Sequence, residues 1–312
     1  MYKVLMYDGG VYRINELYEL IEDIGGFVIN KTQIQVQIIV TVVVPEEDIG
    51  VIEAKSQELG GKLTEVPLAG TEIAVVAPTL GRHHMPHPVC DIAEHLRRYG
   101  AITVVMGLAR GKGRETAQIS TEERATIEEY DAAIFVLGNF EDCIVKEKIR
   151  LFENIETPVV VVCGPEIGSL PHCEALVTGV CRKVERMRRA EEIAKLEETA
   201  MALGGIVEEK RRLIDEDPLF VHPAEVKQRV ESLESVQKSL RPAPIVLHLD
   251  GLRVKVPFEQ YGRELEGIEI FGQRLGDVAR ISGSRIGGST LIKIMTKSEV
   301  AARDARRARP SA

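Results

Sequence analysis

The sequence contains no tryptophan, and aromatic residues make up only 4% of its 312 residues. Proteins that bind single-stranded nucleic acid commonly stack bases on aromatic side chains, so such a stacking platform is not expected here. The formal net charge is −8, whereas a general nucleic-acid binder needs a basic face. The sequence therefore predicts no nucleic-acid partner.

Long apolar stretches are also missing. The longest one, QIQVQIIVTVVVP, is shorter than the roughly 20 residues of a membrane-spanning helix, and glutamines alternate through it. Charged and polar residues interrupt the first segment early, which does not fit a signal peptide. We therefore expect a cytoplasmic protein with no membrane partner. Its five cysteines are then expected to be reduced, catalytic or metal-bound rather than disulfide-bonded.

Several signatures of known sites are absent as well. The cysteine spacing matches no zinc finger, no CxxC pair and no common ferredoxin run. The loop GLARGKGRET is basic and glycine-rich, but Gly113 follows Lys112 where a P-loop needs Ser or Thr. No GxSxG nucleophile motif occurs. We expect no ATP site on this chain.

What is present is an α/β pattern. The first 70 residues predict a ferredoxin-like domain with the order strand, helix, strand, strand, helix, strand. Its first helix ends at Gly25-Gly26, and FVINKTQIQVQIIVTVVV reads as two strands split at Asn30-Lys31. Residues 71–180 carry the continuous apolar runs EIAVVAP, AITVVMG, AAIFVLG and TPVVVVCG, with the weaker EALVTG. Such runs are typical of strands buried on both faces, so this segment predicts a doubly wound parallel sheet.

The remaining segments are of three kinds. Residues 181–241 are charged and strongly helical, which fits either an arm that binds a partner or helices packed on a sheet. Residues 242–300 predict a small β-rich module with Gly and Ser at its turns. Residues 301–312 form a basic tail without apolar periodicity, for which we expect a disordered or loosely docked end.

Chemistry is expected at one edge of the parallel sheet, because such sheets bind ligands beyond the carboxyl ends of their strands. GRHHMPHPVC, which ends at Cys90, follows the first strand, Cys143 follows the third and Cys163 ends the fourth. The basic loop with Arg110 and Lys112 follows the second strand.

We therefore expect the three thiols to converge on a metal, with His83 or His84 adding an imidazole. Each cysteine could instead pack as a small apolar residue, which we favour for Cys173 and Cys181. The basic loop could bind an anion or a sulfide-bearing cluster, or lie free on the surface.

These motifs resemble those of methanogenesis marker protein 7, a family similar to the C protein of the methyl-coenzyme M reductase operon. The pattern shared with operon protein C comprises Gly81, Arg82, His84, Pro88, Val89 and Cys90, with a cysteine that matches Cys163. The likeness to marker protein 7 extends over nearly the whole chain. The likeness to operon protein C covers about residues 71–180.

The resemblance implies a non-catalytic subunit of the ATP-dependent assembly that reduces the nickel coenzyme of methyl-coenzyme M reductase to Ni(I). It implies a complex iron–sulfur cluster, similar to the carbide-containing precursor of the nitrogenase cofactor. Carried over to this chain, Cys90 and Cys163 are cluster ligands, His84 is a ligand or supports one, and Arg82 donates to cluster sulfides. Cys143 lies outside the shared pattern.

The implied partners are methyl-coenzyme M reductase, the related operon protein C, other methanogenesis marker proteins and an ABC-type ATPase. Two other functions stay open. One is a mononuclear metal or thiol enzyme that uses His83, His84, His87 and Cys90. The other is a purely structural scaffold whose cysteines belong to the core.

Overall fold

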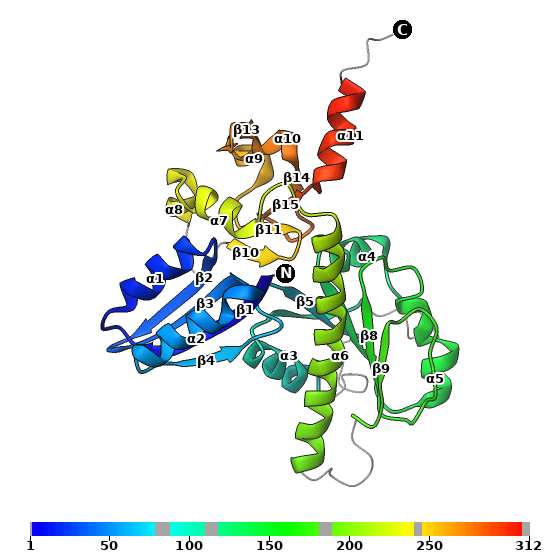
Figure 1. Cartoon of the computed structure of the whole chain (residues 1–312). Helices are drawn as coiled ribbons and strands as arrows, with labels where there is room; N and C mark the ends of the chain where they lie inside the picture. The colour runs from blue at the N-terminus through cyan, green and yellow to red at the C-terminus, as the bar shows by residue number, and fades with distance from the viewer. Residues whose placement is uncertain (1, 79–87, 110–117, 181–188, 240–244, 308–312) are drawn as a thin grey trace. The chain divides into compact units, whose positions relative to one another are not determined.

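The computed structural model describes residues 2–78, 88–109, 118–180, 189–239 and 245–307 (Figure 1). It is a mixed α/β structure with one parallel sheet and several antiparallel sheets. The chain forms two compact units. Unit 1 comprises Met1–Gly70, Lys210–Ser282 and Thr290–Ala312, and unit 2 comprises Thr71–Glu209 and Gly283–Ser289. No helix in the described ranges is long and apolar enough to cross a membrane.

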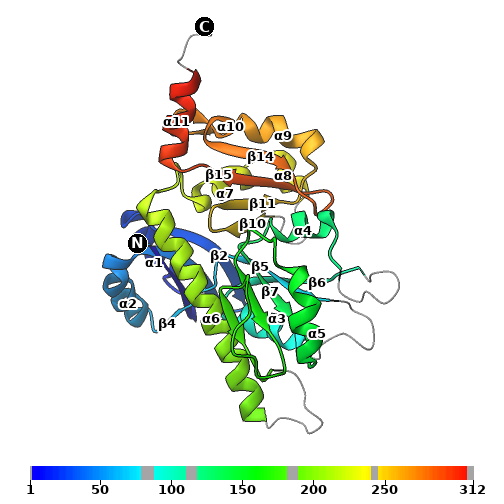
Figure 2. The ribbon, with the colours of Figure 1, turned by 90° about the vertical axis from the view of Figure 1, so that its right-hand side faces the viewer.

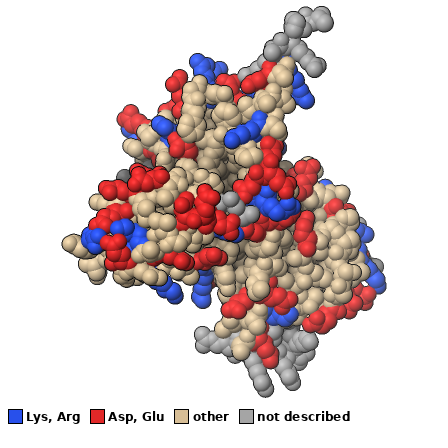
Figure 3. Space-filling model, viewed as in Figure 1, with Lys and Arg blue, Asp and Glu red and all other residues tan. Residues whose placement is uncertain are grey.

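The first part of unit 1 is a four-stranded antiparallel sheet with the order β2-β3-β1-β4. Its elements are β1 (Tyr2–Gly10), α1 (Ile14–Asp23), β2 (Phe27–Ile34), β3 (Gln37–Pro45), the 3₁₀ turn η1 (Glu46–Asp48), α2 (Ile49–Glu58) and β4 (Lys62–Glu65). Helices α1 and α2 cover one face, where their buried side chains pack on alternate residues of β1 and β3 (Figure 1). Ion pairs also join the two helices, and Figure 3 shows basic and acidic side chains side by side there.

The other face of this sheet is covered by the C-terminal part of unit 1. Val4, Ile29 and Val43 belong to the same apolar cluster as side chains more than 150 residues further along the chain. A hydrogen bond also joins the two parts, because the ammonium of Lys227 donates to the carbonyl oxygen of Ile29 at 2.9 Å. Burial on both faces explains why β3 is an almost continuous apolar run.

The C-terminal part of unit 1 contains a four-stranded sheet with the order β10-β11-β15-β14 (Figure 2). Its strands are β10 (Ile245–His248), β11 (Gly251–Val254), β14 (Ala279–Gly283) and β15 (Thr290–Ile294), and a small ribbon is formed by β12 (Glu269–Ile270) and β13 (Gln273–Arg274). Its helices are α7 (Pro223–Glu231), α8 (Glu234–Ser239), α9 (Phe258–Glu266), α10 (Leu275–Val278) and α11 (Lys297–Arg307). Helix α7 packs inside the unit, because Val226 and Val230 are fully buried in its core.

Unit 2 is built on a five-stranded parallel sheet with the order β6-β5-β7-β8-β9. Its strands are β5 (Glu72–Ala77), β6 (Ile102–Gly107), β7 (Ala132–Val136), β8 (Val159–Val162) and β9 (Ala175–Val177). Its helices are α3 (Val89–Arg98), α4 (Thr121–Ile127), α5 (Glu141–Lys146), the 3₁₀ turn η2 (Lys148–Leu151) and the first part of α6 (Arg189–Glu216), which continues into unit 1. All residues of β5, β7 and β8 are buried, as their apolar runs predict.

The segment Gly283–Ser289 belongs to unit 2 although β14 and β15, which it connects, lie largely in unit 1. The carboxylate of Glu129 accepts hydrogen bonds at 2.7 Å from the Ser284 hydroxyl and from the backbone N–H of Arg285. Ile286 packs against the apolar cluster of unit 2. Hydrogen bonds to the Glu129 carboxylate and an apolar contact therefore hold this turn in unit 2.

One expectation from the sequence is wrong, and of the two alternatives for the tail, a disordered or a loosely docked end, the first is excluded for residues 301–307. The strand pair at residues 27–45 turns at Gln35-Val36, and Asn30-Lys31 lie within β2 beside a bulge. Residues 30–34 of β2 are exposed because β2 is an edge strand. Their polar side chains therefore resemble those of a turn in the sequence. Residues 301–307 are not disordered but belong to α11, where Arg303 donates to the carbonyl oxygens of Gly276 and Asp277 at 3.1 Å.

Candidate functional site

The candidate site is the carboxyl edge of the parallel sheet in unit 2. Strands β5, β7 and β8 are direct neighbours in this sheet. Cys90 follows β5, Cys143 follows β7 and Cys163 follows β8. The parallel pairing therefore brings the ends of the three strands that lead to these cysteines to one edge.

The order of the strands reverses at one point of this edge, which is where a ligand site is expected. The chain passes from β5 to β6 on one side of the sheet, and then crosses to β7 on the other side of β5. Open α/β sheets bind ligands where the strand order reverses in this way, at the carboxyl ends. The reversal lies between β5 and β7, the strands that precede Cys90 and Cys143.

Cys90 lies in the first turn of α3 and is exposed. Pro88 takes the capping position of this helix, in agreement with the helix expected from PVCDIAEHLRRYG. Val89, Ile92 and Leu96 anchor one face of α3 in the core. The helix is thus fixed while the thiol stays accessible to a ligand.

Cys163 is held differently, because it is fully buried at the end of β8. Its backbone N–H donates to Val177 at 2.9 Å, and its carbonyl oxygen accepts from Val180 at 3.1 Å. The thiol donates to the carbonyl oxygen of Pro165 at a sulfur–oxygen distance of 3.5 Å. Cys163 also packs in the apolar cluster of unit 2. Its position therefore fits a core residue as well as a ligand buried from water.

Cys143 and Cys173 are both partly exposed. Cys143 lies in the short helix α5, whereas Cys173 lies between β8 and β9. The Cys173 thiol donates to the carbonyl oxygen of Leu170 at 3.4 Å. Burial, and then the negative charge of Glu174, raise the pKa of the Cys173 thiol. A raised pKa disfavours the thiolate that binds metals, in line with the structural role expected for Cys173.

A buried lysine at the same edge was not expected from the sequence. Lys148 is 7% exposed, and its ammonium donates to the carbonyl oxygen of Leu137, directly after β7. The next residue, Gly138, accepts a hydrogen bond from the N–H of Gly164 beside Cys163 at 2.9 Å. The helical spacing of Ile144, Lys148 and Leu151 was the signal, because it places Lys148 on a buried stripe.

The other predicted site residues lie outside the described residues. These are His83, His84, His87 and Arg82 of the loop after β5, and Arg110 and Lys112 of the loop after β6. Cys181, for which a structural role is expected, also lies outside the described residues. The described strands β5 and β6 end directly before these two loops and are neighbours in the sheet. The roles of these loop residues as ligands or donors stay predictions.

The fold and the site define an α/β protein whose cysteines follow neighbouring strands of a parallel sheet, without a P-loop in its sequence. The chain belongs to the methyl-coenzyme M reductase operon protein C family, whose family model matches residues 2–268. This agrees with the resemblance seen in the GRHHMPHPVC motif.

Three relatives are similar to this chain over different lengths. An uncharacterized protein of Methanocaldococcus jannaschii is 45% identical over 301 residues, which is 96% of each chain. Methyl-coenzyme M reductase I operon protein C of the same organism is 30% identical over 102 residues, which is 30% of this chain and 51% of that protein. The operon protein C of Methanosarcina barkeri is 28% identical over 109 residues, 33% of this chain and 52% of that protein.

Proposed function

We propose that this protein is an iron–sulfur electron-transfer and assembly subunit in the activation of methyl-coenzyme M reductase. It acts in the cytoplasm, within the ATP-dependent complex that reduces the nickel coenzyme of that enzyme, and it is not an enzyme by itself. The related operon protein C, other methanogenesis marker proteins and an ABC-type ATPase are its partners. Membership in the operon protein C family supports the link to methyl-coenzyme M reductase.

The observation that carries the cofactor proposal is the sheet order. Three thiols follow three neighbouring strands at the edge where α/β sheets bind ligands. Thiolates are the protein ligands of iron–sulfur clusters, so the donor set has the right chemistry. Cys90, Cys163 and Cys143 would hold the cluster, together with His84 from the loop after β5.

Positive charge is the second part of the proposal. A complex iron–sulfur cluster supplies one-electron redox chemistry, and nearby charge, hydrogen bonds and burial tune its potential. Lys148 provides a buried cation beside the end of β7, and Arg82, Arg110 and Lys112 belong to loops that follow β5 and β6. These cations would compensate the negative charge of the thiolates and sulfides and hold the cluster through hydrogen bonds.

The test is metal and sulfide analysis with EPR on the full-length protein, purified with its native partners under anaerobic conditions. We expect several irons per chain and a matching amount of sulfide. Cys90→Ser and Cys163→Ser should lower both, and Cys173→Ser should leave them unchanged. Because Cys163 is buried, Cys163→Ala and circular dichroism separate loss of the cluster from loss of the fold.

Three outcomes would overturn the proposal. One zinc per chain without sulfide would instead identify a mononuclear site, with Cys90 and the loop histidines as its ligands. Iron-free protein that still supports activation of methyl-coenzyme M reductase would identify a scaffold. A cluster retained in folded Cys90→Ser and Cys163→Ala variants would remove both cysteines from the ligand set.

A further inference from the structure

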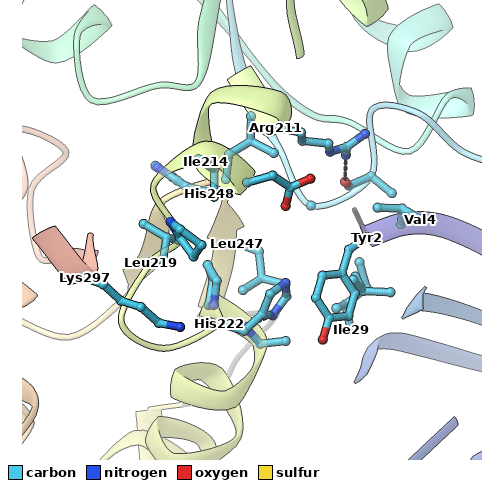
Figure 4. Close-up of a pocket in the computed structure, with 18 residues that line it drawn as sticks. Tyr2, Val4, Ile29, Arg211, Ile214, Leu219, His222, Leu247, His248 and Lys297 are labelled. Carbon is cyan, nitrogen blue, oxygen red and sulfur yellow. Dashed lines mark hydrogen bonds between the residues drawn. The ribbon is translucent and has the colours of Figure 1, made fainter. Parts of the chain in front are cut away.

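Unit 1 contains a cavity of about 320 Å³ (Figure 4). Its walls come from β1, β2 and β3, the end of α6, the start of α7, β10 and the start of α11. Much of the lining is apolar, with Val4, Ile29, Leu219 and Leu247 among its side chains. Its volume lies at the lower end of the roughly 300–1,000 Å³ of small-molecule pockets, which are likewise apolar with a few polar groups.

His222 is a polar group of this cavity that a hydrogen bond and a ring contact hold in place. It caps the N-terminus of α7, where its Nδ1 accepts a hydrogen bond from the N–H of Ala224 at 3.2 Å. Its ring stacks on Phe27 with a centroid distance of 4.6 Å and an interplanar angle of 2°. Burial lowers the pKa of His222 to about 4, so the imidazole is neutral at neutral pH. Since Nδ1 is an acceptor, the ring hydrogen is on Nε2, which is therefore a donor.

Tyr2 lies beside this imidazole, and Figure 4 shows the two rings next to each other in the cavity. Their centroids are 5.3 Å apart and the rings are tilted by 45°. The Tyr2 hydroxyl donates to the carbonyl oxygen of Gly25 at 3.3 Å, which ties the ring to the end of α1. Two aromatic faces fixed by their own contacts are suited to pack against the body of a ligand.

The formal charges at the cavity do not cancel. Arg211 and Asp215 lie one helical turn apart on α6 and carry opposite charges. The guanidinium of Arg211 donates to the carbonyl oxygens of Pro67 at 2.8 Å and Ala69 at 3.1 Å, so it is fixed in place. Lys297 also lines the cavity, is exposed, and forms no ion pair with the residues that the structure describes. Among the Lys, Arg, Asp and Glu side chains of the lining, the surplus charge is that of Lys297, and the imidazoles of His222 and His248 line the cavity as well.

We propose that this cavity binds a small amphipathic anion with a single negative charge. The acidic head pairs with the ammonium of Lys297, and the apolar body lies against Val4, Ile29 and Leu247. The Nε2 hydrogen of His222 supplies a neutral donor. This proposal concerns unit 1 and does not depend on the proposed iron–sulfur function of unit 2.

The test uses three probes with the same apolar chain and different heads, namely hexanoate, 1-hexanol and hexylammonium. Isothermal titration calorimetry on the full-length protein at pH 7.5 measures their affinities. We expect hexanoate to bind most tightly, because only its head complements Lys297. An ion pair of an exposed lysine is worth up to about 1 kcal/mol, so Lys297→Gln should weaken the binding of hexanoate by up to about fivefold. Lys297→Glu should instead make hexylammonium the preferred probe.

Lys31→Gln is the matched control, because Lys31 is an exposed lysine of β2 that does not line the cavity. It should leave all three affinities unchanged. His222→Phe keeps a ring stacked on Phe27 but removes the Nε2 donor. It should weaken the binding of hexanoate and leave the contacts of the probe's apolar chain unchanged. Equal affinities for the three probes, no binding of any of them, or an unchanged affinity of hexanoate for Lys297→Gln would each overturn the proposal.

Discussion

His222, a partly buried histidine of unit 1, makes the stability of the protein depend on pH. Burial lowers the pKa of His222 from its ordinary value of 6.5 to about 4 in the folded state. The folded state therefore disfavours the protonated ring, whereas the unfolded chain accepts the proton freely. The contribution of His222 to stability is constant well above pH 6.5, is lost as the pH drops through that value, and levels off below about 4.

The size of this effect follows from the two pKa values. At pH 5 the unfolded chain holds the His222 proton almost fully, and the folded protein holds it in roughly one molecule in ten. Between pH 8 and pH 5 the free energy of unfolding should fall by about 2 kcal/mol from this residue alone.

The assay is urea unfolding at several pH values between 8 and 5, followed by far-UV circular dichroism because the chain has no tryptophan. His222→Asn is the comparison, since asparagine also caps a helix and does not titrate. The wild type should lose about 2 kcal/mol more than this variant over that pH range. Parallel losses in the two proteins, or an NMR titration that places the pKa of His222 near 6.5, would refute the reasoning.

Two further substitutions test local packing and capping. A Cβ at Gly61 would lie only 2.1 Å from the ring of Tyr7, so Gly61→Ala should cost about 1–3 kcal/mol in urea unfolding. Gly50→Ala is its control, because Gly50 lies in α2 and a Cβ there meets nothing within 4 Å. This substitution should stabilise the protein by about 0.5–1 kcal/mol. Equal effects of the two substitutions would contradict the packing argument. Ser120→Ala removes the acceptor for the Glu123 N–H at 3.1 Å, and should cost about 1 kcal/mol. Ser120→Asp should recover most of that loss by thermal denaturation, and failure to do so would argue against the cap.

The sequence was most informative where the physics is local. Strands β5, β7 and β8 were predictable because burial on both faces demands an unbroken apolar run. In the first 70 residues the expected order of elements is found, although one turn was misplaced onto the exposed half of β2. The order β2-β3-β1-β4 supports the ferredoxin-like assignment, which stays a prediction. Helix α11 was missed because most of its residues are exposed and many are charged.

The candidate site was predictable only in outline. The rule for parallel sheets placed Cys90, Cys143 and Cys163 at one edge, but the sequence does not state which strands are neighbours. The adjacency of β5, β7 and β8 comes from long-range pairing. Lys148 was missed because a lysine is expected to be exposed, although its spacing from Ile144 and Leu151 places it on a buried stripe. The cavity of unit 1 was invisible because Tyr2, His222 and Lys297 are far apart in the chain.

The division of the chain has a consequence for the order in which the protein can fold during synthesis. The first sheet can pack α1 and α2 at once, but its other apolar face is covered by residues that follow Glu209. At roughly 5–20 residues per second, the ribosome needs on the order of ten seconds or more to synthesise the intervening stretch of unit 2. Val4, Ile29 and Val43 remain uncovered during that interval. During this time the apolar sheet face of the nascent chain is accessible to a chaperone. The face becomes covered only when the last part of unit 1 has been synthesised.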